Sequence, residues 1–385
     1  MKINIQNIEK NEQYFKHLEK LSPYVAHLGR LFNKPNPDYE ENIINLPFEE
    51  KYLVDSMNLS EKIQIEKINY VLIVGIGGSN LTVKAVYDAS HGFFDIIEPK
   101  HYPKLIFFDT LNSKFNSNFE RSLRSGQISK NEVLTVFISK SGNTFETVKN
   151  LEFIRNNIKT TRYVSIIGEN AEIEYEKGNK ILKFENYIGG RFSAFSSVGL
   201  FPISTFGDPV EFLTGAMEIT KKCLEMNLEE NPAINSAINI YIKNKPILDT
   251  FVFNSELETL GKWARQLTAE SLGKNGLGFT PTVSVGTTDL HSIAQLYLDG
   301  PDDKYAQFVF SGDGEKDKEI VFNAFKETVA AHGIPFSEFL FSKINEFEIG
   351  SYMQFKFFET LFLAKLLNVS PFGQPAVEEY KSKFS

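Results

Sequence analysis

The chain has 385 residues, of which 42% are hydrophobic and only one, Cys223, is a cysteine, and its formal net charge is −8. This length and composition are typical of one large folded domain or two smaller ones. The acidic balance argues against a nucleic-acid binder, which needs Lys and Arg to neutralise phosphates, and the single cysteine excludes an internal disulfide.

The first residues, MKINIQNIEKNEQYF, contain no apolar run typical of a secretory signal. No stretch approaches the roughly 18 apolar residues that a membrane-spanning helix needs. We therefore expect a cytoplasmic protein without nucleic-acid or membrane partners.

Helical spacing of apolar residues, at Tyr14, Leu18, Leu21 and Val25, predicts a helical N-terminal extension over residues 1–45. From Tyr70 onward, β-branched apolar runs alternate with helical patterns, which predicts βαβ units in a first domain at 46–207. The strands expected in it are 70–75, 105–108, 133–138, 163–167 and 181–184.

A second half with a similar layout follows a polar helical bridge at 208–247 and completes a domain at 208–367. Its expected strands are 248–253, 281–286 and 306–310, and its main helices are 256–272, 322–331 and 352–367. A last helix within 368–385 begins at Pro375. The pattern thus predicts an α/β fold of two doubly wound parallel-sheet domains with helical N- and C-terminal extensions, and ligands bind such sheets at the carboxyl ends of the strands.

A hydroxyl-rich segment, SKSGNT at 139–144, separates an expected strand from an expected helix. Hydroxyls, an ammonium group and unpaired backbone N–H groups at a helix N-terminus suit a terminal phosphate monoester held without metal. An ordinary turn with Ser and Thr as helix caps is the alternative, and this segment alone does not decide between them.

A glycine-rich turn, GIGGSN at 75–80, follows the first strand of this domain and places Ser79 at a helix start. It is similar to a dinucleotide-binding loop, but Asn80 occupies the last glycine position. On neighbouring strands, this turn and the 139–144 segment could face one phosphate.

Arg191 follows two glycines. In the functional interpretation it is a fixed cation that faces a developing oxyanion, and the alternative is an ordinary surface arginine. Glu270 lies at the edge of the apolar face of an expected helix, one turn after Gln266. Partial burial would raise its pKa and suit it as a general base, although spacing alone favours an exposed glutamate.

His291 is expected in the first turn of a helix, where the helix dipole favours a neutral imidazole that can shuttle protons. Gln374 and Lys381 share one face of the last helix, where a lysine is usually a solvated end charge. No group of His, Cys, Asp and Glu has the spacing of metal ligands.

Taken together, six motifs resemble the phosphoglucose isomerase family in its short bacterial form, and they occur in the family's order from about Ile44 to Lys381. The motifs are VGIGGSN, ISKSGNTFET, GGRFS, GKWARQLTAES, VGTTDLHS and PFGQPAVEEYK. The resemblance implies two sugar-isomerase (SIS) domains of flavodoxin-like architecture. It also implies interconversion of glucose 6-phosphate and fructose 6-phosphate through a cis-enediolate, in glycolysis and gluconeogenesis, with no metal or organic cofactor.

Carried over to this chain, the resemblance implies that Glu270 is the base and that Arg191, with the backbone at Gly190, stabilises the enediolate. It implies that His291 and Lys381 assist ring opening, and that His291 is donated to the other subunit of a homodimer. The residues implied to line the site or to hold the phosphate are Gly78, Ser79, Ser139, Lys140, Ser141, Thr144, Gln266 and Gln374.

The chain departs from the usual family pattern at Asn80, Thr82, Gly373 and Ala376. Two further hypotheses compete with the isomerase. A sugar-phosphate sensor would keep the phosphate loop without needing the four catalytic groups, and a dinucleotide oxidoreductase would need a glycine where Asn80 stands.

Overall fold

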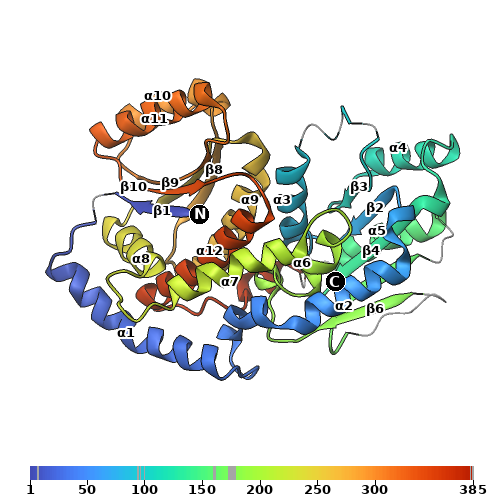
Figure 1. Cartoon of the computed structure of the whole chain (residues 1–385), viewed down its shortest axis with the longest axis horizontal. Coiled ribbons are helices and arrows are strands. Elements are labelled where there is room, and N and C mark those ends of the chain that lie inside the picture. Colours follow the sequence, from blue (N-terminus) through green and yellow to red (C-terminus); the bar gives the residue numbers. More distant parts are fainter. Residues whose placement is uncertain are drawn as a thin grey trace. The chain divides into compact units, whose positions relative to one another are not determined.

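The computed structural model describes residues 1–6, 8–92, 95, 97, 98, 100–158, 162–171, 179–381 and 383. The chain divides into two compact units, each built on its own five-stranded sheet (Figure 1). We call Glu49–Val210 the central unit. Met1–Phe48 and Glu211–Ser382 form the terminal unit.

The sheet of the central unit has the strand order β3-β2-β4-β5-β6, and all its strands run parallel. The strands are β2 (Tyr70–Val74), β3 (Lys104–Phe108), β4 (Val133–Ser139), β5 (Tyr163–Gly168) and β6 (Lys180–Phe184). These are the five strands that the sequence predicts, and their parallel order confirms the predicted α/β class.

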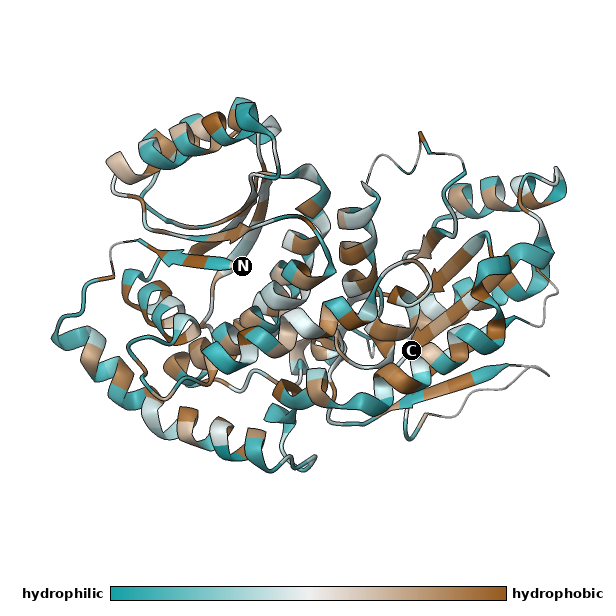
Figure 2. Ribbon diagram, viewed as in Figure 1, coloured by the Kyte–Doolittle hydropathy of each residue, from teal (hydrophilic) through white to brown (hydrophobic). Residues whose placement is uncertain are grey.

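Helices cover this sheet, and its inner strands β2, β4 and β5 are almost wholly buried and largely apolar (Figure 2). The helices are α2 (Glu50–Ile63), α3 (Leu81–Ser90), α4 (Ser113–Arg124), α5 (Phe145–Asn157) and α6 (Ser197–Ile203). Every residue of β4 is buried. Phe108 and Phe137 from the sheet pack with Phe119 of α4 and Leu151 and Ile154 of α5 in one hydrophobic core.

The sheet of the terminal unit has the order β1-β10-β9-β7-β8, with β1 antiparallel to β10 and the other strands parallel. The strands are β1 (Lys2–Ile5), β7 (Ile247–Val252), β8 (Thr280–Val285), β9 (Lys304–Ser311) and β10 (Phe336–Phe341). The helices are α1 (Glu12–Asn33), α7 (Pro209–Cys223), α8 (Pro232–Lys243), α9 (Glu258–Leu272), α10 (Ala294–Asp299), α11 (Lys316–Ala331), α12 (Glu346–Leu367) and α13 (Pro375–Lys381).

The sequence-based prediction missed two strands of this sheet, β1 and β10. Residues 2–5 form β1, so the expectation of a wholly helical segment over 1–45 is wrong there. Lys2 of β1 pairs with Leu340 of β10. Pairing between residues so far apart in the sequence leaves no local pattern from which β1 could be predicted. An antiparallel edge strand on an otherwise parallel sheet is a common arrangement. Of the C-terminal helix, Phe384 lies outside the described residues, and α13 ends at Lys381.

Buried charge interrupts the aromatic core of the terminal unit. Lys356 and Glu359 on α12 are each 1% exposed and form an ion pair. Gln307 of β9 accepts a hydrogen bond from Lys356 at 2.8 Å and donates one to Glu359 at 3.0 Å. Because each charge has a partner and further hydrogen bonds, burial of the pair is tolerated.

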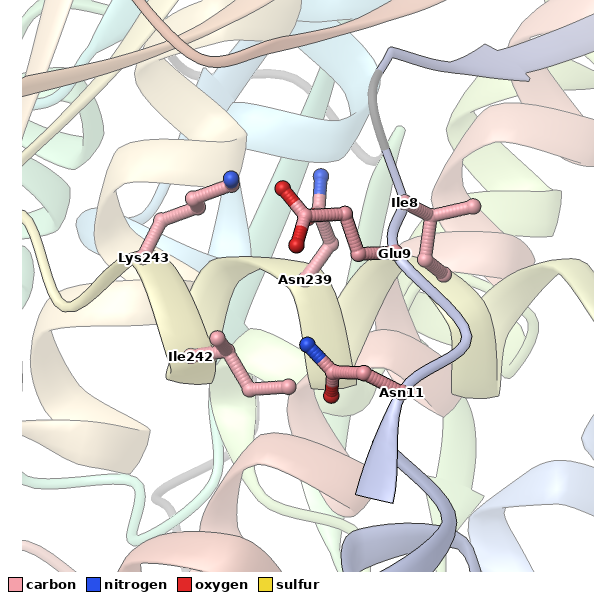
Figure 3. Close-up of a pocket in the computed structure, with 6 residues that line it drawn as sticks. All are labelled: Ile8, Glu9, Asn11, Asn239, Ile242 and Lys243. Atoms are coloured by element: carbon pink, nitrogen blue, oxygen red, sulfur yellow. The ribbon is translucent and has the colours of Figure 1, made fainter. Parts of the chain in front are cut away.

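A cavity of about 30 Å³ lies between the segment before α1 and helix α8 (Figure 3). Its lining residues are Ile8, Glu9, Asn11, Asn239, Ile242 and Lys243. This volume has room for about two water molecules. It is too small for a sugar phosphate and is not a candidate active site.

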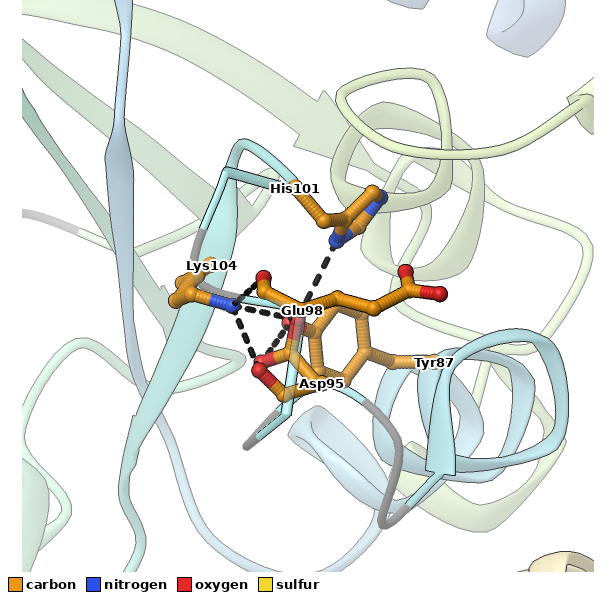
Figure 4. A network of polar contacts seen from close by, with 5 residues as sticks. All are labelled: Tyr87, Asp95, Glu98, His101 and Lys104. Atoms are coloured by element: carbon orange, nitrogen blue, oxygen red, sulfur yellow. Dashed lines mark hydrogen bonds and ion pairs between the residues drawn. The ribbon is translucent and has the colours of Figure 1, made fainter.

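A polar cluster around Asp95 secures the start of β3 (Figure 4). Lys104 donates to the carboxylate and to the backbone carbonyl of Asp95, both at 2.7 Å, and the Tyr87 hydroxyl donates at 2.8 Å. His101 lies 3.1 Å from the same carboxylate. Burial by itself would raise the pKa of Asp95, but the hydrogen bonds from Lys104, Tyr87 and His101 outweigh it and lower the pKa.

We expect Asp95→Asn to lower the free energy of unfolding at pH 7 by about 1–3 kcal/mol, because charged hydrogen bonds become neutral ones. A carboxyl with a lowered folded-state pKa stabilises the fold above its ordinary pKa of 3.8, and this contribution disappears as the pH falls through the folded-state value. Urea unfolding at pH 7 and pH 3 should therefore show a difference between the two proteins that shrinks in acid.

Glu98→Gln is the matched control, because Glu98 is exposed and only its backbone carbonyl accepts from Lys104. It removes the same charge and should leave stability unchanged. Equal effects of the two substitutions would contradict the assigned role of Asp95.

Candidate functional site

The hydroxyl-rich segment lies in the central unit, between the end of β4 and the start of α5. Ser139 is 2% exposed, and its hydroxyl lies 3.2 Å from the hydroxyl of Thr144. The backbone N–H of Gly142 donates to the Ser139 hydroxyl at 3.1 Å, and a φ of +78° at Gly142 forms the turn. Two of the predicted hydroxyls are thus held together beside the N-terminus of α5, a position that favours anions.

The other two residues of this segment that the sequence analysis assigns to the phosphate, Lys140 and Ser141, are more exposed. Ser141 lies at the surface and accepts a bond from the N–H of Asn143 at 3.4 Å. The ammonium group of Lys140 donates to the backbone carbonyl of Asn186 at 2.6 Å. An ammonium group has three N–H donors, so this hydrogen bond by itself does not exclude the phosphate contact that the sequence analysis expects of Lys140.

The glycine-rich turn lies directly beside the hydroxyl-rich segment, because β2 and β4 are paired neighbours. A Cβ atom on Gly75 would lie 3.1 Å from the backbone oxygen of Ile138, the residue before Ser139. Residues Gly77–Ser79 form a short 3-10 helix, η3, ahead of α3. The expected proximity of these two loops on adjacent strands is therefore found.

A third loop packs on the glycine-rich turn with no side chain between them. A Cβ atom on Gly78 would lie 2.2 Å from the carbonyl carbon of Gly190. The Ser193 hydroxyl donates to the carbonyl oxygens of Gly190, at 2.7 Å, and Gly78, at 3.4 Å. The contact brings the 3-10 helix η6 (Gly190–Phe192), and with it Arg191, next to the turn that carries Ser79.

Arg191 is only 4% exposed. Its guanidinium group lies 5.2 Å from the centre of the Phe192 ring, within the range of a cation–π contact. The alternative of an ordinary surface arginine is therefore wrong. A buried guanidinium held beside a ligand loop is suited to stabilising negative charge.

Glu270 lies in the last turn of α9 in the terminal unit, and its side chain is half-buried. The amide of Gln266 donates to its carboxylate at 2.8 Å. The face of the helix next to it is packed into the core by Trp263, Ala264 and Leu267, each 1% exposed or less. A carboxylate that is fixed by a neighbouring amide and partly removed from water can act as a positioned base.

The segment that carries Gln374 is tied to this end of α9. The ammonium group of Lys274, just after α9, donates to the backbone carbonyls of Ser370 and Phe372, each at 2.6 Å. Gly373 follows with a φ of +67°, which favours glycine at this position. Lys381 ends α13 and pairs with Glu378 at 3.1 Å on an exposed surface.

His291 does not occupy the position that the sequence predicts. It is the exposed last residue of a 3-10 helix, η8 (Thr288–His291), and α10 begins only at Ala294. The expectation of a first-turn position, and the dipole argument based on it, are wrong. The carboxylate of Asp289 accepts a hydrogen bond from the N–H of Val285 at 2.6 Å, and this closes a separate turn before α10.

Glu270 and His291 lie toward opposite ends of the strands in the sheet of the terminal unit. Strands β7 and β8 are parallel, so α9 returns the chain from the carboxyl end of β7 to the amino end of β8. Glu270 is near the end of that return, whereas His291 follows the carboxyl end of β8. The length of β8, six residues, separates the two ends by roughly 20 Å.

Residues 61–289 match the family model of phosphoglucose isomerase, which is more than half of the chain. The chain belongs to the phosphoglucose isomerase family.

Relatives within the phosphoglucose isomerase family extend the likeness beyond the matched segment. A probable glucose-6-phosphate isomerase of Methanococcus maripaludis is 34% identical, over 80% of this chain and 76% of the relative. A glucose-6-phosphate isomerase of Methanocaldococcus jannaschii is 32% identical, over 84% and 85%. The crystal structure of a glucose-6-phosphate isomerase from Chlamydia trachomatis shares the fold, with a TM-score of 0.82, 18% identity and coverage of 99% of this chain and 87% of that chain.

The match to phosphoglucose isomerase includes the loops of the central unit, Arg191 and Glu270, and it ends two residues before His291. Within the described residues, no group of three or more His, Cys, Asp or Glu could hold a metal ion. Across the same described ranges, no helix has the length and apolar character needed to cross a membrane.

We predict that Gly78→Ala destabilises the fold by about 1–3 kcal/mol, because the new methyl group would overlap the backbone of Gly190 and force the two turns apart. Thermal unfolding measures the effect. Gly189→Ala is the control, since its Cβ would meet only Phe192 at 3.6 Å and its φ of −73° suits alanine. A Gly78→Ala protein as stable as Gly189→Ala would show that the close backbone contact is not required.

Proposed function

We propose that this chain interconverts glucose 6-phosphate and fructose 6-phosphate by proton transfer through a cis-enediolate. The observation that carries this conclusion is the family match over residues 61–289, supported by the relatives with that activity in their names. A sensor without turnover is disfavoured, because it has no need of a buried Arg191 and a positioned Glu270. Nor is a dinucleotide oxidoreductase favoured by the match.

Proton transfer is the task assigned to Glu270. An aldose–ketose interconversion needs one base that removes the proton from C2 and returns it to C1. The hydrogen bond from Gln266 supports this assignment, because it fixes the carboxylate within one helix turn. Negative charge then develops on the enediolate oxygens, and Arg191 with the backbone at Gly190 is proposed to stabilise it.

Binding of the substrate phosphate is assigned to the loops of the central unit. The proposed contacts come from Gly78, Ser79, Ser139, Lys140, Ser141 and Thr144. Neutral hydroxyls and backbone N–H groups at a helix N-terminus can hold a dianion without a metal. Because the phosphate is remote from C1 and C2, its binding energy can be used to position the reacting carbons.

Ring opening precedes proton transfer, and we assign it to His291 and Lys381, with Gln374 lining the site. The positions of Glu270 and His291 at opposite edges of one sheet support a homodimer in which each chain supplies His291 to the site of its partner. Groups at opposite ends of a strand that is roughly 20 Å long are too far apart to act on neighbouring atoms of one sugar. The same proposal places phosphate binding in a domain at 46–207 and the base and histidine in a domain at 208–367. It also includes a returning helix at 368–385 and a cytoplasmic location.

We predict that Glu270→Gln lowers kcat by at least about a thousandfold while the sugar phosphate still binds. The amide keeps the shape and the bond to Gln266 but cannot accept a proton. A coupled assay measures turnover, and isothermal titration measures binding.

Glu258→Gln is the control for this experiment, because Glu258 lies on the same helix and pairs with Lys262 at the surface. It should retain the wild-type rate. Wild-type turnover by Glu270→Gln would refute the assignment of the base.

We predict that Ser139→Ala combined with Thr144→Ala raises KM for glucose 6-phosphate by about tenfold or more, since loss of hydrogen bonds to a charged group costs about 1.5–3 kcal/mol. Steady-state kinetics measures KM. Ser122→Ala on α4, where the hydroxyl bonds only to the Asn118 carbonyl, is the control. An unchanged KM in the double variant would mean that the phosphate binds elsewhere.

A further inference from the structure

The segment 286–293, which carries His291, connects the end of β8 to the start of α10 (Figure 1). His291 itself is exposed, so packing around its own side chain does not account for its placement. Its position must be set by the elements on either side of the segment. Both of these elements are bonded to one buried carboxylate, Asp249 of β7.

Asp249 is 2% exposed and lies opposite Thr282 of β8 in the sheet. The Thr282 hydroxyl donates to one carboxylate oxygen at 2.5 Å. The hydroxyl of Tyr297 on α10 donates to the other oxygen at 3.1 Å. The hydroxyl of Ser284 on β8 also favours the charged form of this carboxyl and lowers its pKa. The single carboxylate thus joins the strand before the His291 segment to the helix after it.

The other arm of this connection is equally buried. Tyr297 is 4% exposed, and its ring packs against Phe251 of β7 with centroids 5.7 Å apart. Burial and the nearby Asp249 raise the pKa of Tyr297, so its hydroxyl remains a donor at neutral pH. Rotation of α10 away from the sheet would therefore break a hydrogen bond and expose an aromatic contact.

A carboxylate at this place is costly for stability. Burial raises the pKa of Asp249. The hydroxyl groups around it lower the pKa only in part, and the nearby charge of Asp289 raises it further. The partners that the structure gives it are neutral hydroxyls, which compensate a buried charge less well than a cation does. An apolar residue would pack here at a lower cost in folding free energy. We therefore expect the hydrogen bonds that Asp249 accepts from β8 and from α10 to have a role.

We propose that Asp249 is a positioning residue for ring opening, which acts by fixing both flanks of the segment that presents His291. This inference rests on the proposed ring-opening role of His291. The carboxylate bonds Thr282 of β8 on one side and Tyr297 of α10 on the other, so η8 is held between two fixed ends. The hydrogen bond from the Val285 N–H to Asp289 shortens the free part of the segment further.

The test uses Tyr297→Phe, which removes only the hydroxyl that reaches Asp249. Two-dimensional exchange NMR measures the enzyme-catalysed interconversion of the α and β anomers of glucose 6-phosphate, which requires ring opening but no proton transfer at carbon. We expect about a tenfold slower exchange, because a shift of a catalytic group by a fraction of an ångström has effects of this order. KM should stay within about twofold, since the phosphate contacts are untouched.

The matched control is Tyr305→Phe. Tyr305 is 1% exposed in the same unit, and its hydroxyl bonds to the amide of Asn239 at 2.9 Å, without contact to the His291 flanks. This variant should lose stability to a similar degree and keep the wild-type exchange rate. Equal exchange rates in the two variants would overturn the proposal. If Tyr297→Phe does not fold, Thr282→Val removes the other arm and serves the same comparison.

Combination with His291→Ala separates this inference from the proposed function. If Asp249 acts through His291, Tyr297→Phe should slow exchange no further in the His291→Ala background. A further tenfold loss there would refute the positioning role. Wild-type exchange by His291→Ala alone would overturn the ring-opening assignment, and the role of Asp249 with it. Slow exchange by His291→Ala with normal exchange by Tyr297→Phe would reject only the inference about Asp249.

Discussion

Parallel strand pairing requires the chain to cross back to its starting edge after every strand, and the location of each functional group in this protein depends on that requirement. In the central unit, the loops after β2 and β4 emerge side by side because the two strands are neighbours. The hydroxyls of Ser139 and Thr144 and the turn that carries Ser79 therefore meet without any long-range loop. The Gly78–Gly190 contact adds Arg191 to the same edge, and it requires a residue without a side chain at position 78, where a Cβ atom would overlap the backbone of Gly190.

The same requirement has the opposite consequence in the terminal unit. Helix α9 returns the chain between the parallel strands β7 and β8, so Glu270 ends at one edge of the sheet while His291 begins at the other. A reaction that uses both groups on one sugar then needs His291 from a second copy of the chain. The homodimer that we propose would follow from this topology, and the proposed role of Asp249 is to fix the angle at which each chain presents its histidine to the other.

Most of the fold could be predicted from local sequence, because fully buried parallel strands such as β4 are continuous apolar runs and their helices have clear periodicity. The strand β1 could not, since the hydrogen bonds that define it join residues more than 330 positions apart. The strand β10 was missed because Ser337 and Glu338 interrupt its apolar run. The chemistry-bearing loops were evident from their hydroxyls and glycines, but the burial of Arg191 was not, because no local pattern shows that the loop carrying it packs on the turn at Gly78. The position of His291 was mispredicted because the bond from Val285 to Asp289 inserts a turn before α10. The local sequence gives no sign of that hydrogen bond.

Proton NMR of glucose 6-phosphate incubated with the protein in D2O tests the central claim most directly, because it follows the transferred proton without a coupling enzyme. We expect the C2 proton signal of glucose 6-phosphate to decline as deuterium enters from the exchanged base, and fructose 6-phosphate to appear at the same time. Binding of the sugar phosphate with an unchanged spectrum would contradict it. The fold would then serve recognition alone, and the roles assigned to Glu270, Arg191, His291 and Lys381 would fall together.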